Sequence, residues 1–308
     1  MTEEEIGDYI NAVVEHAVNN VTYSNYFVSQ IRRLAEQALE DCLTVLLSAK
    51  RSNTKKQKGE IDNEIARILL NFEKEVDEFV AKEMAKIIES ESEFLNSIIG
   101  SALGVSFVIP ATALSILSIV PIANAGIPKN FGNYCSDGLK KIYDSMTNQS
   151  YVFGEDYEEL ADQYESRFNA YIRGLEAEAE TVGYSLPNEF DRIVYTKNDK
   201  KISSYIWNSM LDTSTCLLCA SLSGTRYEKI EDVPYYPPHL KCRCFICPCT
   251  DEIADNIPES YSEWFEKQPR EKKYEALGKT RFQLYEKGMK IKQFVNNGKI
   301  TPLKDLRK

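Results

Sequence analysis

Hydrophobic residues recur at three- and four-residue spacing through the first half of the chain, which is the period of an amphipathic helix. Thr2 and Glu5 have the spacing of a capping box, so we expect a helix to begin at the N-terminus. The apolar stripes predict helices over residues 2–17, 26–49 and 61–92, with a polar, basic and solvent-exposed loop at 50–59. These apolar faces require partners, either one another or copies in an oligomer.

Residues 94–128 contain no charged side chain. The mean hydropathy of residues 98–116 is about 1.9, which is in the range of membrane-spanning helices. Pro110 and Pro121 interrupt the stretch, as expected for two short buried segments joined by turns. We interpret it as buried core or a subunit interface. The alternatives are a segment that contacts a membrane only after release and a resident transmembrane helix.

The sequence pattern of the second half changes twice, from helical to β-prone and back to helical. Residues 138–146 and 155–181 return to helical period, whereas β-prone runs at 192–195 and 202–207, a turn at Gly224 and a Pro-rich segment at 234–238 predict a small α+β module. The last 48 residues read as helix again. The predicted fold class is therefore mainly α. The predicted parts are an N-terminal helical domain (1–93), an uncharged apolar segment (94–128), a helical linker (129–186), a Cys/His-rich α+β module (187–260) and a basic helical tail (261–308).

Composition restricts the function classes. With 43% hydrophobic and 27% charged residues, the 308-residue chain is neither wholly disordered nor a polytopic membrane protein. The net charge of −10 argues against a protein that coats DNA, although residues 264–308 carry 13 Lys/Arg against 5 Asp/Glu. The acidic start lacks the features of a secretory signal, so we expect synthesis in the cytoplasm.

Six of the eight cysteines lie between residues 216 and 249, and the remaining two, Cys42 and Cys135, read as packing residues. In a reducing compartment such clustering favours metal binding over disulfides. A CxxC pair precedes an HxxCxC segment by about 20 residues, which gives five candidates for the four ligands of a tetrahedral zinc ion. These candidates are Cys216, Cys219, His239, Cys242 and Cys244.

The second half of this cluster leaves alternatives open. Cys242 and Cys244 would point to opposite faces of an extended segment, so either the backbone bends there or only one of them binds together with His239. We expect one structural zinc ion on Cys219, His239 and Cys242, with Cys216 or Cys244 as the fourth ligand. Cys247 and Cys249 are interpreted as buried or free thiols, with a second site as the alternative.

The same residues carry a family resemblance. The segment resembles the Mu F-like minor head, or head-morphogenesis, proteins of bacteriophages, and a second block in the tail reads WFEKQP followed by LGKTRFQLYEKG. The resemblance covers residues from about 120 to 300 and is strongest from 207 to 290. The matching residues of the first block are Trp207, Asp212, Thr215, Cys216, Cys219, Leu222, Gly224, Pro237, Pro238, His239, Cys242, Arg243 and Cys244.

The resemblance implies a virion protein, made in the host cytoplasm and incorporated in few copies inside the capsid near the portal. Portal and major capsid proteins would be its partners, it would be oligomeric in the virion, and it would be ejected with the genome. Nothing in it implies a reaction, and we expect no catalytic residues. After ejection, residues 94–128 could contact the host membrane.

Two other function classes remain open. One is a nuclease or toxin-like enzyme built on the Cys/His cluster, with Asp212 as acid/base and Arg243 as phosphate ligand. The other is a DNA-binding zinc module. The basic tail could contact packaged DNA through phosphates, or dock on an acidic portal or capsid surface, which we favour because few of its aromatic rings are expected to be exposed for base stacking.

Overall fold

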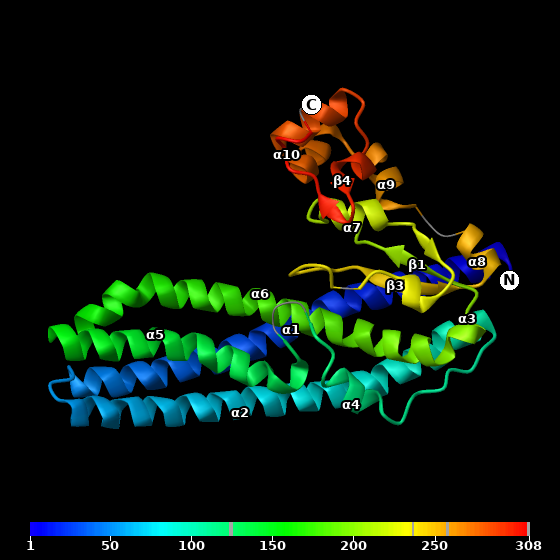
Figure 1. Cartoon of the computed structure of the whole chain (residues 1–308). Coiled ribbons are helices and arrows are strands. Elements are labelled where there is room, and N and C mark those ends of the chain that lie inside the picture. The colour runs from blue at the N-terminus through cyan, green and yellow to red at the C-terminus, as the bar shows by residue number, and fades with distance from the viewer. Residues whose placement is uncertain (123–125, 236, 257–258, 307–308) are drawn as a thin grey trace. The chain divides into compact units, whose positions relative to one another are not determined.

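The computed structural model describes residues 1–122, 126–235, 237–256 and 259–306, and most of them are helical (Figure 1). The chain divides into two compact units. Unit 1 comprises Met1–Asn19, Glu91–Pro110 and Asp191–Lys308, and unit 2 comprises Asn20–Ser90 and Ala111–Phe190. The predicted mainly α fold with a small sheet is confirmed.

Four long helices supply most of unit 2: α1 (Glu3–Ala49), α2 (Lys55–Phe94), α5 (Phe131–Phe153) and α6 (Tyr157–Asn198). Within this unit they form an antiparallel bundle, in which short connections join α1 to α2 and α5 to α6 (Figure 1). Its core contains fully buried aromatic and aliphatic side chains from every helix, such as Ile31, Val76, Phe131 and Leu160. The hydroxyl of Tyr143 also donates to the backbone oxygen of Leu39 at 2.8 Å, which ties α5 to α1.

Helix α1 begins as predicted. The backbone N–H of Glu5 donates to Thr2 Oγ1 at 3.2 Å, and that of Thr2 donates to Glu5 Oε2 at 2.7 Å, so the capping box is formed. The two predicted apolar runs are parts of one helix. Asn20 and Ser24 are buried between them, so the inward face continues through polar residues that a hydrophobic pattern does not record.

The connection between α1 and α2 is shorter than the predicted loop at 50–59. Thr54 Oγ1 accepts from the backbone N–H of Gln57 at 3.1 Å and starts α2 at Lys55. Ser52 is buried rather than solvent-exposed, because its N–H donates to Ser150 Oγ at 2.9 Å and its hydroxyl lies 2.5 Å from that of Tyr157. The polar composition of this loop therefore serves hydrogen bonds to the α5–α6 connection as well as solvation.

The uncharged stretch folds into short pieces. They are the π-helical turn η1 (Leu95–Ile99), α3 (Gly100–Leu103), which ends at Gly104 with φ of 66°, and α4 (Ala113–Leu117). No helix in the described part of the chain is both long enough and apolar enough to span a membrane. Leu95, Ile99 and Phe107 are buried, as expected for core residues. The stretch is only partly buried, because these large apolar side chains are exposed: Ile98, Val108, Leu114, Ile116 and Ile119. Residues 123–125 of the stretch lie outside the described residues.

The predicted β-prone run at 192–195 is wrong. Helix α6 continues through Pro187 to Asn198, because Phe190 and Val194 are buried at i, i+4 spacing and packing outweighs the strand propensity of β-branched residues. Asn198 then exchanges two hydrogen bonds of 2.9 Å with the backbone of Val108. The end of α6 and the chain at Val108 are thereby joined within unit 1.

The predicted run at 202–207 is a strand. In unit 1, β1 (Ser204–Asn208) is the centre of an antiparallel sheet of order β2-β1-β3, with β2 at Arg226–Tyr227 and β3 at Phe245–Cys249. Trp207 on β1 pairs with Ile246 on β3 and is fully buried. The short helix α7 (Leu217–Leu222) lies between β1 and β2 in the chain, and α8 (Asp251–Asp255) follows β3.

The tail packs around its own core. It contains α9 (Tyr261–Lys267), α10 (Arg270–Glu286) with a kink at Gly278, the 3₁₀ turn η5 (Ile291–Phe294), and a hairpin of β4 (Val295–Asn296) and β5 (Lys299–Ile300). The hairpin corrects the all-helical expectation for this region. Asn297 and Gly298 between its strands both have positive φ, as a two-residue hairpin turn requires. Residues 257–258 and 307–308, which the prediction placed in the module and the tail, are outside the described residues. The core residues are Ala220, Tyr261, Phe265, Leu277, Phe282, Ile291 and Phe294.

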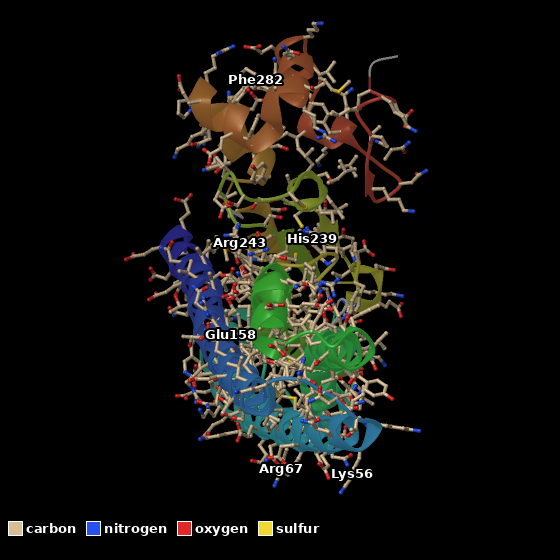
Figure 2. The ribbon with its side chains drawn as sticks, turned by 90° about the vertical axis from the view of Figure 1, so that its left-hand side faces the viewer. Lys56, Arg67, Glu158, His239, Arg243 and Phe282 are labelled. Atoms are coloured by element: carbon tan, nitrogen blue, oxygen red, sulfur yellow. The ribbon has the colours of Figure 1, made fainter. Side chains whose placement is uncertain are left out.

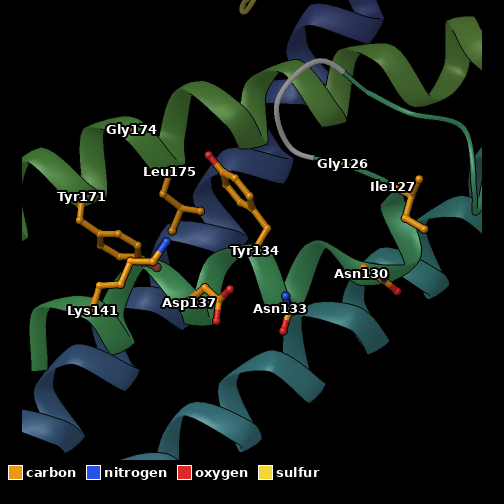
Figure 3. A pocket seen from close by; sticks show the side chains of 11 residues that line it. Gly126, Ile127, Asn130, Asn133, Tyr134, Asp137, Lys141, Tyr171, Gly174 and Leu175 are labelled. Carbon is orange, nitrogen blue, oxygen red and sulfur yellow. The ribbon is translucent and has the colours of Figure 1, made fainter. Parts of the chain in front are cut away.

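Unit 2 carries a pocket of about 590 Å³ on the flank of α5 and α6 (Figure 3). Tyr134, Tyr171 and Leu175 form its apolar part, and Asp137 and Lys141 lie at its rim. None of the residues that the sequence nominates as site residues lines it. The chemistry of those residues is therefore confined to unit 1.

Two glycines on α6 test the packing of unit 2. A Cβ on Gly183 would lie 2.9 Å from Phe27 Cβ and 3.1 Å from Ser24 Cα, whereas one on Gly174 would have no heavy atom within 4 Å. We expect Gly183→Ala to destabilise the protein by about 1–3 kcal/mol through overpacking. Gly174→Ala should stabilise it by about 0.5–1 kcal/mol, because alanine restricts the unfolded chain. Urea unfolding followed by far-UV circular dichroism measures both, and equal losses of stability would contradict the packing at Gly183.

Candidate metal centre

The first half of the centre is built by the start of helix α7. Cys216 is the N-cap residue, and its Sγ accepts from the backbone N–H of Cys219 at 3.4 Å. The CxxC spacing places Cys219 in the first turn of the helix, so both sulfurs lie on the same side of one turn. The neighbouring Ala220 and the apolar tail core hold this turn in place.

The second half depends on a bend after His239. Lys241 has a φ of 58°, in the left-handed region, and residues 242–244 are not part of a strand, since β3 begins only at Phe245. Cys242 and Cys244 therefore both lie near Cys219, with the sulfur atoms of all three within 4.8 Å of one another. Of the two sequence alternatives, the structure shows the bent backbone.

All five candidate ligands converge in unit 1, and Cys219 is common to the two groups that they form. One group is Cys216, Cys219 and His239, and the other is Cys219, Cys242 and Cys244. His239 Nε2 lies 3.1 Å from the sulfur atoms of both Cys216 and Cys219, and the sulfurs of Cys219 and Cys242 are 3.8 Å apart. Figure 2 labels His239 and, from the same segment, Arg243.

The sulfur–sulfur distance suits a tetrahedral metal ion. Metal–sulfur bonds of about 2.3 Å place neighbouring sulfurs of a tetrahedron about 3.8 Å apart, as observed for Cys219 and Cys242. His239 Nδ1 donates to the backbone oxygen of Leu240 at 2.7 Å, which leaves Nε2 as the nitrogen that faces the sulfurs. The Cys-rich cluster could thus hold a metal ion.

Two cysteines are candidates for the fourth ligand. Cys216 contacts His239 and is partly exposed, whereas Cys244 is buried and lies 3.4 Å from the hydroxyl of Ser209. Ser209 also donates to the backbone oxygen of Cys219 at 2.8 Å. Sequence analysis missed Ser209, because a lone serine carries no signal of its own. Its two contacts connect Cys244 to the first half of the centre.

Mutual contacts set the protonation of the metal-free cluster. The pKa of Cys216 is lowered to about 4 by its contacts with Cys219 and His239, and the pKa of Cys242 is lowered to about 2 by Cys219 and Cys244. Contacts with Cys216 and Cys242 raise the pKa of His239 to about 11. The pKa of Cys219 is raised, first by its contact with Cys216, and burial raises that of Cys244. At neutral pH the cluster therefore holds two thiolates beside an imidazolium.

An ion pair joins the two halves independently of any metal. Arg243 donates to both oxygens of Asp212, at 2.7 and 3.0 Å. Asp212 Oδ1 also accepts from the backbone N–H of Ser214 at 2.9 Å and from Thr215 Oγ1 at 3.3 Å. The spacing of Asp212, Thr215 and Cys216 therefore describes a capped turn, and Arg243 between two cysteines anchors the other half to it.

The remaining motif residues position this turn. Gly224, with φ of 79°, donates its N–H to the backbone oxygen of Trp207 at 2.9 Å, and a Cβ there would lie 3.1 Å from Ser260 Cβ. The hydroxyl of Tyr261 donates to the backbone oxygen of Asp212 at 3.1 Å. Sheet, turn and tail thereby meet around the cluster.

The other cysteines lie outside the metal-binding groups found among the described residues. Cys42 and Cys135 are fully buried in unit 2, in keeping with the packing role predicted for them. Cys247 and Cys249 are buried on β3 with sulfurs 3.8 Å apart, and the hydroxyl of Tyr9 lies 3.5 Å from Cys247 Sγ. The second histidine, His16, instead contacts Glu91 at 2.8 Å.

Comparisons of the chain with family models, with curated proteins and with solved structures gave no match. The assignment of the centre therefore rests on its geometry and on its motif.

Removing the central sulfur should abolish metal binding. We expect Cys219→Ser to lose the ion and to make residues 212–249 sensitive to protease, because a structural metal contributes on the order of 10 kcal/mol to folding of a small domain. Cys42→Ser, which changes a buried cysteine of unit 2, is the matched control and should keep its metal. Metal analysis and limited proteolysis measure the two effects, and a metal-replete Cys219→Ser protein would contradict the site.

Metal affinity should rise with pH. With Cys216 as the fourth ligand, binding displaces one proton from His239, whose pKa is about 11, and one from Cys219, because Cys216 and Cys242 are already thiolates above pH 5. Two displaced protons give an increase of about 100-fold in apparent affinity per pH unit. Competition with a chromophoric chelator between pH 6 and 8 measures the slope, and an affinity that is constant over this range would contradict these protonation states.

Proposed function

We propose that the metal is zinc and that its role is structural. One nitrogen and three sulfur ligands form a set that zinc prefers. The strands of the module have 5, 2 and 5 residues, which is too little regular structure to be stable by its own apolar burial. With five donors close to one another, four can close a tetrahedron without an open position for water or substrate.

We further propose that the protein is a phage virion component of the Mu F-like minor head type, which acts in capsid assembly near the portal. The observation that supports this most is the convergence of the motif. Several residues that resemble the family signature meet in one structure: Trp207 on the buried strand, Asp212 in the capped turn, Gly224 at the bend, and Arg243 in its pair with Asp212. Because the signature residues together build one metal-binding fold, their match to the family signature supports membership in that family.

The same contacts argue against the enzymatic alternative. A general acid or base must reach a substrate proton, yet both carboxylate oxygens of Asp212 accept from Arg243, and Oδ1 also accepts from Ser214 and Thr215. Arg243 is likewise engaged by a carboxylate of its own chain rather than free for a phosphate. We therefore assign both residues to holding the fold together.

Incorporation into particles tests the proposal. We expect that the chain, co-produced with portal and major capsid proteins, co-sediments with procapsids in few copies. Cys219→Ser should reduce its incorporation at least about tenfold, because the module is unfolded without metal. Cys42→Ser should be incorporated like the wild type. Procapsids that form normally and contain none of the wild-type chain would overturn the proposal, as would cleavage of plasmid DNA by the purified protein.

A further inference from the structure

The positive charge of the tail falls into two groups once its ion pairs are assigned. Four basic residues form ion pairs with carboxylates. Lys267 lies 2.8 Å from Glu259, and Arg270 lies 2.9 Å from Glu286. Lys273 and Lys290 share Glu266, at 3.8 and 3.4 Å. These charges stabilise the tail itself. They are largely neutralised for any ligand.

The second group consists of the exposed lysines for which no carboxylate partner is found among the described residues. Lys272 and Lys279 lie on α10, and the others lie on one segment. Residues 287–304 contain five lysines and no acidic residue. Of these, Lys287, Lys292, Lys299 and Lys304 are exposed, and no ion pair to a carboxylate is found for them within the described residues. An uncompensated charge of about +4 is therefore concentrated on 18 residues of a chain whose net charge is −10.

Packing and hydrogen bonds hold this segment in a defined conformation. Ile291 and Phe294 of η5 are buried in the tail core, which also contains Phe282, labelled in Figure 2. Because a 3₁₀ turn has three residues per turn, these two share the inward side and Lys292 lies on the outward side. The hairpin of β4 and β5 follows and is closed by a 2.8 Å hydrogen bond from the N–H of Thr301 to the oxygen of Phe294 (Figure 1).

The chemistry of this surface fits phosphates better than a protein partner. All four unpaired cations are lysines, which act as point charges, whereas protein interfaces are enriched in arginine and aromatic residues and depleted in lysine. The only aromatic residue of the segment, Phe294, is buried, so no ring is exposed for stacking on the bases of a single strand. The matching ligand is the regular phosphate backbone of duplex DNA.

We propose that residues 287–304 form a sequence-independent binding surface for duplex DNA, with Lys287, Lys292, Lys299 and Lys304 as the residues that bind phosphates. This goes beyond the proposed role in capsid assembly and requires only the charge of the segment. Binding without incorporation into particles, or incorporation without binding, would separate the two proposals.

Fluorescence anisotropy with a labelled 30-base-pair duplex of arbitrary sequence tests the surface in the full-length protein. We expect the fourfold Lys→Gln variant at 287, 292, 299 and 304 to weaken binding at least about tenfold at 100 mM NaCl. The slope of log affinity against log salt should decrease by about 0.9 for every phosphate that is no longer neutralised by a lysine. The matched control is the fourfold Lys→Gln variant at 55, 82, 129 and 141. These lysines of unit 2 are exposed and have no ion pair among the described residues, so the control removes the same charge and should bind within about twofold of the wild type.

Both variants should show wild-type ellipticity and metal content, which excludes unfolding as the cause of weaker binding. Three outcomes would overturn the proposal. The wild type does not bind the duplex at 50 mM NaCl, the two variants are weakened equally, or poly-L-glutamate binds to the wild type more tightly than the duplex does. The last outcome would identify the segment as a site for an acidic protein.

Discussion

The module between β1 and β3 depends on the meeting of Cys219 with His239. These residues are 20 positions apart, and among the described residues between them the regular structure consists of the end of α7, two residues of β2 and a single 3₁₀ turn. Because so little backbone is held by strands or helices, a metal ion bound by both halves would be the strongest link between them. Ala220 of α7 also packs in the tail core, which holds the first half from its other side.

The Asp212–Arg243 pair gives the module a second link of a different kind. It is only partly shielded from water, with 24% and 39% of the Arg243 and Asp212 side chains exposed, so its strength is modest compared with that of metal ligation. Its value lies in geometry, because a bidentate pair fixes both orientation and distance. It aligns the half carrying Cys216 with the half carrying Cys242 independently of a metal. The entropy cost of binding an ion between the two halves would be reduced accordingly.

The sequence predicted those features that are encoded locally. The capping box at Thr2, the apolar stripes of α1 and α2, the strand around Trp207 and the convergence of CxxC with HxxCxC all rest on short-range spacing. Tertiary contacts decide the others. No spacing rule predicts that Lys241 adopts a left-handed conformation or that α6 passes through Pro187, because the surrounding fold supports both. The hairpin at 295–300 is a different case, since Asn297–Gly298 is a local turn signal that a helical reading of the tail overlooked.

The placement of the tryptophans has a spectroscopic consequence. The chain has two, Trp207 and Trp264, and both belong to unit 1. Trp207 is fully buried on the strand that leads to the metal centre, and Trp264 packs against the tail core. Indole fluorescence therefore reports on the module and the tail alone, while far-UV ellipticity is dominated by the long helices. Recording both in one titration separates the local opening of the Cys/His-rich module from the unfolding of the bundle without a label.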